Sequence, residues 1–586
     1  MLKEILQLFE KEYKSKMQPD NPDFFLTKNH VPENGDYLIL GETDSGFEPL
    51  ETITIKTDKK NIEPDTGYYY YDFIQYADYH SKYLESNKAI ADKNIHSNNY
   101  LTLFIKKENI TNGKITGETL TKYYDVFRNP YKKYNKPNLK KAYKALEEKY
   151  GPSDIARINK IENWVKDHLL CMDFGDEKGY IKLFFYYSKE DYKKESEKYI
   201  LTNLYNSADY NVEIDGKIYG VPNNNMALNA KKPYLEQKTR KNVSPVLITQ
   251  DEVLLQKKFF DYLSNLSKKN QCNLYINEDG LQPFEDGESP SGSFTGYFIR
   301  IQKGMEPEII YYDTVLNYQE VIPKILIKNY LHFEKSSLEY RSVNQIKTLR
   351  GIINEYLFRK CLAGNYFNPS DKIRISDSCL KRNILLTRSI LFKWFYLGME
   401  DGVWQVLKAS SIDLIKNSIL NGSYKKAKEQ YNLYLSLKER FEGGNTVNDI
   451  LVNIDLLQEK INNSNPSKIE NEAEFFFYVG QLTYYFLTLS KAGTKALSLS
   501  KPILNASSAA AMKKELRKLF DKYNYSITTE PKYQRFRTMY SLVSLCQIDI
   551  KGINEDALIG GYLYPNMIYK GKEDSTANTN QEKSNG

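Results

Sequence analysis

The chain has 586 residues, of which 41% are hydrophobic and 27% are charged, and its formal net charge is +7. This length is too great for one hydrophobic core, and this composition excludes a wholly disordered protein. We therefore expect a globular protein of two or more domains.

The ends of the chain and its apolar runs argue against export and membrane insertion. The N-terminal sequence MLKEILQLFEKEYKSK alternates charged and apolar residues and lacks the apolar core of a signal peptide. The longest uncharged apolar run, Phe475 to Ser490, includes Gln481 and is short for a membrane span, so it predicts a buried helix. Five cysteines are scattered without C-x-x-C spacing, which predicts neither a disulfide framework nor a metal site. We expect a cytoplasmic protein with no membrane partner.

The N-terminal region, residues 1–335, has α+β character. Short apolar runs predict strands at DYLIL, YLTLFI, IKLFFYY, NLYINE and YFIRIQ. Helical periodicity predicts helices over Leu139–Tyr150 and Glu252–Leu266. Turn residues dominate Glu285–Gly296, which predicts an exposed loop between strands.

Two segments of this region combine polar or aromatic side chains with cations. In IHSNNYLTLFIK, residues 95–106, Asn98 and Asn99 precede a strand and could contact base edges. Between Lys122 and Lys144 there are eight Lys or Arg, including Lys132 and Lys133, and one acid, interleaved with aromatic residues. Cations attract phosphates and aromatic rings can stack on unpaired bases. A core position for the aromatic residues, with the lysines on a solvated face, is the alternative.

A third segment is the richest in this pattern. Residues 220–241, GVPNNNMALNAKKPYLEQKTRK, carry five cations and one acid. Amide side chains can donate to and accept from bases, and the cations supply attraction to any phosphate backbone. Ordinary turns and solvated lysines are the alternative. The candidate nucleic-acid contacts are Asn223, Asn224, Asn225, Asn229, Lys231, Lys232, Lys238 and Arg240.

After about His332 strand signals nearly vanish, so the main boundary is expected between residues 333 and 400. We assign 336–398 to a helical connecting region, 399–568 to a helical bundle and 569–586 to a disordered tail. A capping box at Thr446 and Asp449 predicts a helix start. Further helices are expected at about 472–490, 508–524, 533–546 and 554–564.

The bundle contains the strongest local excess of positive charge. Residues 488–541 hold eleven Lys or Arg and three acids, a net charge of 11 − 3 = +8. Helical spacing places one apolar set together, namely Met512, Leu516, Leu519, Phe520 and Tyr523. The opposite face carries Lys513, Lys514, Arg517, Lys518 and Lys522, and Arg535 and Arg537 of the next helix could extend it. A polyanion is the partner that this face predicts, with a plain solvated face as the alternative.

Catalytic motifs are not evident in the sequence. The glycines at 41 and 46 are followed by Phe47 and Glu48 rather than by the lysine of a phosphate-binding loop. The five histidines have no metal-binding spacing, and no nucleophile motif is present. We therefore expect a non-enzymatic protein without a cofactor.

Several long segments resemble a known family. These are NKAIADKNIHSNNYLTLFIK, YYDVFRNPYKKY, DYNVEIDGKIYGVPNNNMALNAKKPYL, AEFFFYVGQLTYYFLTLSKA and NEDALIGGYLYPNMIY. In this order they resemble the large subunit of the type I-B CRISPR Cascade complex, an RNA-guided antiviral assembly. The resemblance covers nearly the whole chain except the tail.

The resemblance implies a division of labour and a set of partners. The N-terminal domain would bind the 5′ handle of the guide RNA, recognise the protospacer-adjacent motif (PAM) in double-stranded target DNA, aid strand separation and recruit the helicase-nuclease. The C-terminal bundle would resemble the small subunit, which lies along the guide and the displaced DNA strand. The protein partners of the chain would be the backbone and small subunits of the complex. In this family that bundle can also be translated separately, and Met399 is a candidate start. Two alternatives remain, a nuclease or guide-processing enzyme of the same system and a general RNA-binding scaffold.

Overall fold

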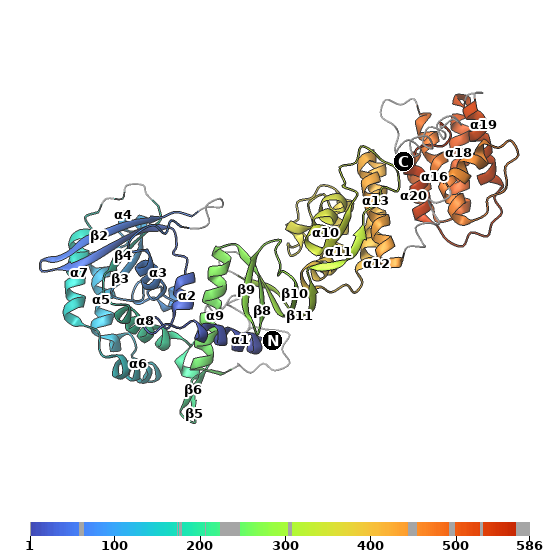
Figure 1. The fold of residues 1–586 in the computed structure, drawn as a ribbon. Coiled ribbons are helices and arrows are strands. Elements are labelled where there is room, and N and C mark those ends of the chain that lie inside the picture. The colour runs from blue at the N-terminus through green and yellow to red at the C-terminus, as the bar shows by residue number, and fades with distance from the viewer. Residues whose placement is uncertain are drawn as a thin grey trace, which may run out of the picture. The chain divides into compact units, whose positions relative to one another are not determined.

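The computed structural model describes residues 2–57, 64–172, 174, 178–205, 207–222, 247–302, 308–443, 454–490, 499–527 and 531–569. The chain divides into two compact units. Unit 1 comprises Met1–Pro290 and Thr295–Val315, and unit 2 comprises Ser291–Phe294 and Leu316–Gly586. The predicted fold class is confirmed, because the described chain is mixed α/β up to about residue 350 and helical from 378 to 563 (Figure 1).

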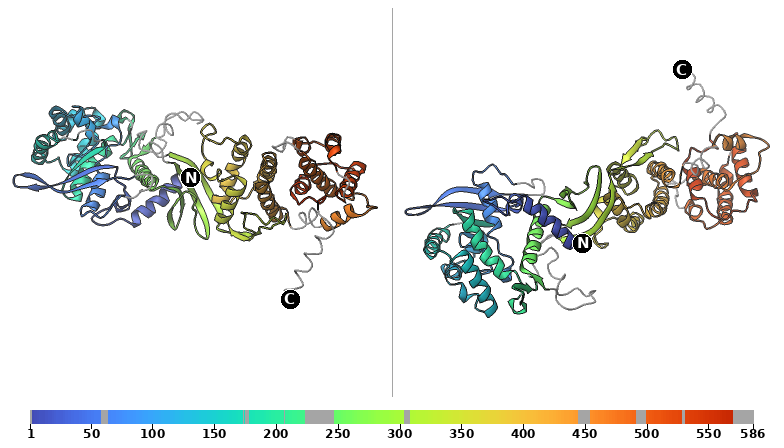
Figure 2. Two further views of the ribbon diagram at one scale, coloured as in Figure 1. Left: turned by 90° about the horizontal axis from the view of Figure 1, so that it is seen from above. Right: turned by 60° about the horizontal axis from the view of Figure 1, so that its bottom comes forward.

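The first sheet of unit 1 has the strand order β2-β1-β4-β3. Its strands are β1 (Gly35–Thr43), β2 (Gly46–Ile55), β3 (Thr102–Lys106) and β4 (Tyr180–Phe185). β1 pairs in parallel with β4, whereas β1–β2 and β3–β4 are antiparallel. Both faces of β1 and β4 are buried, which explains why DYLIL and IKLFF are nearly continuous apolar runs. The β1–β2 hairpin reaches past the end of β4, which pairs only as far as Leu40 (Figure 2).

Helices complete the core around this sheet. They are α3 (Tyr71–Tyr79), α5 (Gly117–Arg128), α7 (Ile155–Leu169) and α8 (Lys189–Asn203). Trp164 of α7 fixes its helix to β2 by donating a 2.9 Å hydrogen bond from its indole nitrogen to the carbonyl of Phe47. Two further helices of this region are α4 (Lys107–Thr111) and α6 (Pro137–Tyr150).

A second sheet has the order β11-β10-β8-β9 and packs with three helices. The strands are β8 (Gln271–Asn277), β9 (Gly280–Glu285), β10 (Ser293–Gln302) and β11 (Glu308–Gln319). The helices are α1 (Leu2–Ser15), α2 (Phe24–Asn29) and α9 (Gln250–Lys268). Thr249 and Glu252 form a capping box that starts α9. β10 begins at Ser293, so the predicted loop from Glu285 is shorter than expected.

A small sheet is formed by described residues that precede and follow residues 223–246 in the sequence. It consists of β5 (Val212–Ile214), β6 (Lys217–Gly220) and β7 (Ile248–Thr249) in sequential order. Gly220 pairs with Ile248 in antiparallel register. The described residues that flank the segment therefore lie side by side.

Unit 2 begins with a short two-stranded sheet, β12 (Val321–Leu326) and β13 (Ser342–Gln345), and continues with helices. The division between the units falls at Val315, before the interval of residues 333–400 in which the sequence placed it. The helices are α10 (Ile346–Ile352), α11 (Ser378–Leu397), α12 (Val403–Leu420), α13 (Tyr424–Glu442), α15 (Ile454–Asn462), α16 (Glu472–Thr488), α17 (Lys501–Leu504), α18 (Ala509–Tyr523), α19 (Pro531–Leu545) and α20 (Glu555–Leu563).

The predicted helices at 472–490, 508–524, 533–546 and 554–564 correspond to α16, α18, α19 and α20. The predicted capping box at Thr446 and Asp449 lies outside the described residues, as does the predicted tail at 569–586 except for Tyr569, whose hydroxyl is hydrogen-bonded to that of Thr488. The apolar run from Phe475 is a buried helix, as predicted, and forms the centre of the unit 2 core. Within the described stretches, no helix is long and apolar enough to cross a membrane.

Candidate nucleic-acid interface

Helix α18 has one buried and one exposed face. Ser508 caps its start by accepting a 3.2 Å hydrogen bond from the backbone N–H of Ala511. Phe520 is partly buried against the unit 2 core. The other members of the predicted apolar face are no more than 7% exposed, and they are Met512, Leu516, Leu519 and Tyr523. The predicted apolar face is therefore confirmed, and burial of these side chains fixes which face points outward.

The outward face carries a row of cations that we call the α18 stripe. It consists of Lys514, Arg517, Lys518 and Lys522, all of which are exposed. Their spacing of three and four residues places them along one side of the helix. Asp521 lies beside the stripe and is also exposed, so one negative charge accompanies the four positive charges.

Two cations of the α18 stripe have acidic neighbours on their own helix. Arg517 Nε donates to Asp521 at 2.9 Å, and Lys518 Nζ donates to Glu515 at 2.7 Å. The Arg517 and Lys518 side chains are 66% and 60% exposed. Exposed ion pairs contribute only about 0–1 kcal/mol to stability, so a phosphate can replace these carboxylates at small cost.

Two neighbouring cations serve the fold instead. Lys513 Nζ donates to the carbonyl of Cys546 at 2.7 Å, and Arg535 Nε donates to the carbonyl of Ile568 at 2.8 Å. Both side chains are partly buried. The predicted extension of the basic face into α19 therefore depends on Arg537, which is exposed.

An exposed aromatic ring follows the α18 stripe. Tyr525 lies just beyond the end of α18 and is 71% exposed. A ring in this position can stack on an unpaired base beside a cationic row. Sequence reasoning missed this residue, although an aromatic residue directly after the last basic turn was the signal.

In unit 1 the aromatic residues between Lys122 and Lys144 belong mainly to the core. Tyr131 is partly exposed, but its hydroxyl donates to Glu147. The others are no more than 9% exposed, and they are Tyr123, Tyr124, Phe127, Tyr134 and Tyr143. The stacking interpretation of these buried rings is wrong, because four of them lie on the buried faces of α5 and α6 and Tyr134 is buried in the connection between the two helices.

The lysines of the same segment differ in their surroundings. Lys133 Nζ donates to the carbonyl of Ile90 at 2.6 Å and also to that of Ala89, so it ties two loops together. Burial, together with the nearby ammonium of Lys88, lowers the pKa of Lys133 to about 8. Lys132 and Lys140 are exposed and have no acidic partner among the described residues. A surface role for Lys133 is therefore not supported, whereas Lys132 remains a candidate.

The predicted contacts through Asn98 and Asn99 disagree with the structure. Both residues are 0% exposed. Asn98 Nδ2 donates to the carbonyl of Lys82 at 2.9 Å, and Asn99 Nδ2 donates to the carbonyl of Tyr192 at 3.1 Å. Their amides satisfy buried backbone groups at the turn before β3, so they cannot meet base edges.

The remaining predicted contacts lie outside the described residues. They are Asn223, Asn224, Asn225, Asn229, Lys231, Lys232, Lys238 and Arg240. The described residues that remain candidates for such an interface are the α18 stripe with Tyr525 and Arg537 in unit 2, and Lys132 in unit 1.

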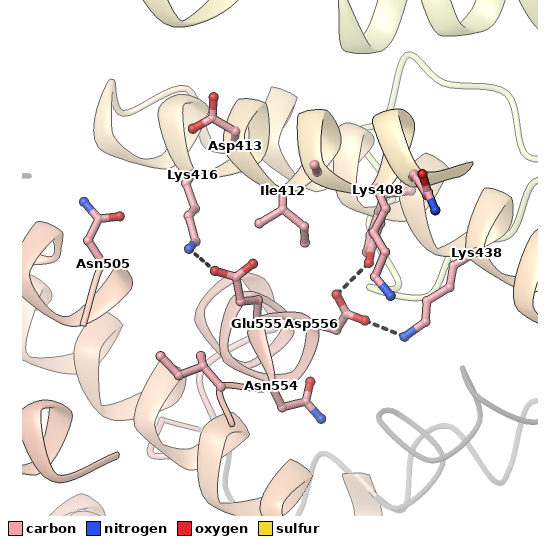
Figure 3. A pocket seen from close by; sticks show the side chains of 13 residues that line it. Lys408, Ile412, Asp413, Lys416, Lys438, Asn505, Asn554, Glu555 and Asp556 are labelled. Carbon is pink, nitrogen blue, oxygen red and sulfur yellow. Dashed lines mark hydrogen bonds and ion pairs between the residues drawn. The ribbon is translucent and has the colours of Figure 1, made fainter. Parts of the chain in front are cut away.

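A cleft of about 860 Å³ in unit 2 has a different character (Figure 3). It lies between α12, α13 and the start of α20, and its lining includes three lysines and three carboxylates. Lys416 Nζ donates to Glu555 at 2.5 Å, and Lys438 Nζ donates to Asp556 at 2.5 Å (Figure 3). Lys408 Nζ donates to Glu442 at 2.7 Å. Because each lysine has a carboxylate partner, the cleft offers no surplus of charge to a polyanion.

Comparisons with known protein families, with curated proteins and with solved structures return no match. Within the described residues, no group of three or more His, Cys, Asp or Glu side chains could hold a metal ion.

Proposed function

We propose that the protein binds nucleic acid and that the α18 stripe is one of its contact surfaces. The observation that carries this proposal is the row of four exposed cations on a helix whose opposite face is buried. Such a row matches the regular negative charge of a phosphate backbone, which attracts cations whatever the base sequence. Tyr525 beside the stripe adds an exposed ring for an unpaired base.

We further propose that the chain is a non-enzymatic large subunit of a type I-B CRISPR Cascade complex. The support is the set of long segments that resemble this family, which run in order through most of the chain. In this role unit 1 would read the PAM and the guide handle, and unit 2 would follow the guide and the displaced strand. Guide pairing would supply most of the sequence specificity, as in other RNA-guided effectors. The partners would be guide RNA, target DNA, the other Cascade subunits and the helicase-nuclease.

Residues 220–232 are the first choice for PAM contacts. They include three consecutive asparagines and two adjacent lysines. Minor-groove edges carry little information and suit amides and cations.

A binding assay tests this assignment. A guide-loaded complex is presented with two duplexes that differ only in the PAM, with the wild-type chain and with Asn223→Ala, Asn224→Ala and Asn225→Ala combined. We expect the wild type to discriminate and the triple variant to lose discrimination. If neither protein discriminates, the PAM-reading role is wrong and a general RNA-binding scaffold becomes the better proposal. Cleavage of guide precursor or target by the purified chain with magnesium would instead support a nuclease.

A separate C-terminal product is a second element of the proposal. Met399 lies between the end of α11 and the start of α12, so translation from it would begin at a helix boundary. The product would have 586 − 399 + 1 = 188 residues. Mass spectrometry of the purified complex should detect this product, and its absence would reject Met399 as a start.

A further inference from the structure

Unit 1 contains a small polar cavity away from the residues discussed above. Its volume is about 160 Å³, far more than the ~15 Å³ that one water molecule needs. The walls come from His30, α3, the residues that follow α3, α8 and α9. The polar side chains that line it include Lys82, Lys257, Lys268, Ser264, Asn265 and Asp261.

Two of the three lysines are neutralised within the protein. Lys82 pairs with Glu33, and the Lys82 side chain is 52% exposed, so the cavity is reachable from solvent. Lys257 Nζ lies 2.6 Å from a carboxylate oxygen of Asp261, which also accepts a 3.1 Å hydrogen bond from the hydroxyl of Tyr79. These two pairs leave no surplus charge of their own.

Lys268 is the third lysine of the cavity and belongs to neither of these ion pairs. Its ammonium donates to the backbone carbonyl of Val31 at 2.9 Å. Within the described part of the chain, no carboxylate forms an ion pair with it. Burial, with a contribution from the nearby Lys82, lowers the pKa of Lys268 to about 8. The carboxylates of Glu33 and Asp78 act on Lys268 only from a distance, so the cavity holds an ammonium with no direct carboxylate partner, and a bound anion would stabilise its charge.

The other charged groups near Lys268 are already committed. Asp78 is 1% exposed. One oxygen of its carboxylate accepts a 2.6 Å hydrogen bond from Lys182 Nζ, and the other lies 2.7 Å from His30 Nε2. Neither Asp78 nor Glu33 pairs directly with Lys268. A small anion that enters the cavity would thus meet an ammonium without a competing carboxylate on it.

We propose that this cavity binds a phosphate-like oxyanion, with Lys268 as the principal ligand and Ser264 and Asn265 as neighbouring hydrogen-bond donors. A tetrahedral oxyanion carries several acceptor oxygens, and an ammonium with two neutral donors is the complementary set. The anion could be inorganic phosphate or the terminal phosphate of a nucleic-acid strand, since both present the same oxygens. The site depends only on the cavity in unit 1 and not on the α18 stripe of unit 2.

Calorimetric titration with inorganic phosphate, in chloride of matched ionic strength, tests the site on the full chain. We expect the wild type to bind one phosphate and Lys268→Gln to bind at least tenfold more weakly. Lys14→Gln removes an exposed lysine of α1 and should bind as the wild type does. Lys268→Arg keeps the charge and should retain binding.

Two results would overturn the proposal: no phosphate binding by the wild type at millimolar concentration, or equal binding by Lys268→Gln. If Lys268→Gln does not fold, Ser264→Ala takes its place in the test. Ser264→Ala removes one hydroxyl and should weaken phosphate binding several-fold. Competition with short oligonucleotides that carry or lack a 5′ phosphate identifies the source. Stronger competition by the phosphorylated strand assigns the site to strand ends, and equal competition assigns it to free phosphate.

Discussion

Lys438 of α13 donates a 2.5 Å hydrogen bond to the carboxylate of Asp556 in α20, and these two side chains are only 9% and 10% exposed (Figure 3). The same carboxylate accepts a 2.8 Å hydrogen bond from the hydroxyl of Tyr434. Tyr431 donates to the backbone carbonyl of Asp556, also at 2.8 Å. Asp556 lies in the first turn of α20, where the helix dipole favours a negative charge. One acidic residue therefore joins two helices that are far apart in sequence.

Asp556→Asn should destabilise unit 2. The substitution removes the nearer of the two carboxylates that pair with buried Lys438, the other being Glu442 at 3.7 Å, and breaking a buried pair from one side costs up to about 3–5 kcal/mol. Glu555→Gln is the matched control, because Glu555 pairs with Lys416 but its side chain is 41% exposed. Its cost should be no more than about 1 kcal/mol. Denaturant unfolding of both variants measures the difference, and equal costs would contradict a buried role for the Lys438–Asp556 pair.

Gly480→Ala should also destabilise unit 2, by about 1–3 kcal/mol or more. A Cβ at Gly480 would lie 2.2 Å from the carbonyl oxygen of Leu558, and one at Gly561 would lie 2.1 Å from that of Phe477. Helices α16 and α20 thus cross backbone against backbone, which leaves no flexible atom to move aside.

Gly351→Ala is the control for this crossing. Gly351 lies inside α10, and a Cβ there would meet nothing within 4 Å. Alanine in an open helical position stabilises by about 0.4–1 kcal/mol. The same chemical change should therefore have opposite signs at residues 480 and 351 in thermal unfolding, and a stabilising Gly480→Ala would show that the helices separate readily.

Stability should fall as the pH drops from 6.5 toward 5, and His80 should contribute to this fall. Burial lowers the pKa of His80 from its ordinary value of 6.5 to about 3. The carboxylate of Asp23, whose Oδ2 lies 3.9 Å from His80 Nε2, acts in the opposite direction but is outweighed. Below pH 6.5 the unfolded chain binds a proton that the folded chain does not, so stability present above pH 6.5 is lost on acidification. One such group accounts for about 2 kcal/mol between pH 6.5 and 5.

The variant His80→Gln isolates this contribution. Its unfolding free energy should change less between pH 7 and pH 5 than that of the wild type, by about 2 kcal/mol. Burial also lowers the pKa of His96, to about 4, so His96 should contribute equally to the pH dependence of both proteins. An unchanged pH dependence in His80→Gln would mean that His80 has the same pKa in the folded chain as in the unfolded chain.

Periodicity predicted what a single helix or strand determines by itself. The α18 stripe follows from spacing alone, because a helix with one apolar face must expose the other. The strands DYLIL and IKLFF were likewise visible as apolar runs. Contacts between distant segments were not visible, and neither Lys438–Asp556 nor the crossing at Gly480 has a local signal.

The failures have the same physical origin. Asn98 and Asn99 resemble a polar surface loop in sequence, but their side-chain amides donate hydrogen bonds to the carbonyls of Lys82 and Tyr192, which come from distant segments. Lys133 looks like a surface cation, but its ammonium meets two carbonyls about forty residues earlier in the chain. Composition shows that a side chain is polar, and only the tertiary fold shows which groups already use it.

Combined replacement of Lys514, Arg517 and Lys518 by Gln should weaken nucleic-acid binding and its salt dependence. All three side chains lie on the exposed face of α18 and none is needed for the unit 2 core. Each phosphate contact contributes about 0.9 to the magnitude of the slope of log K against log salt for a duplex. Loss of three contacts should therefore reduce the magnitude of this slope by up to ~2.7.

A charge-matched variant separates this local effect from a general loss of positive charge. Lys11, Lys14 and Lys194 of unit 1 are exposed and paired on the surface, and their replacement by Gln removes the same three charges. If the α18 stripe contacts phosphates, the salt slope falls only in the α18 variant, in titrations of the purified chain with the same duplex. Equal slopes in the two variants would mean that net charge alone attracts nucleic acid, and the α18 stripe would then be an ordinary solvated surface.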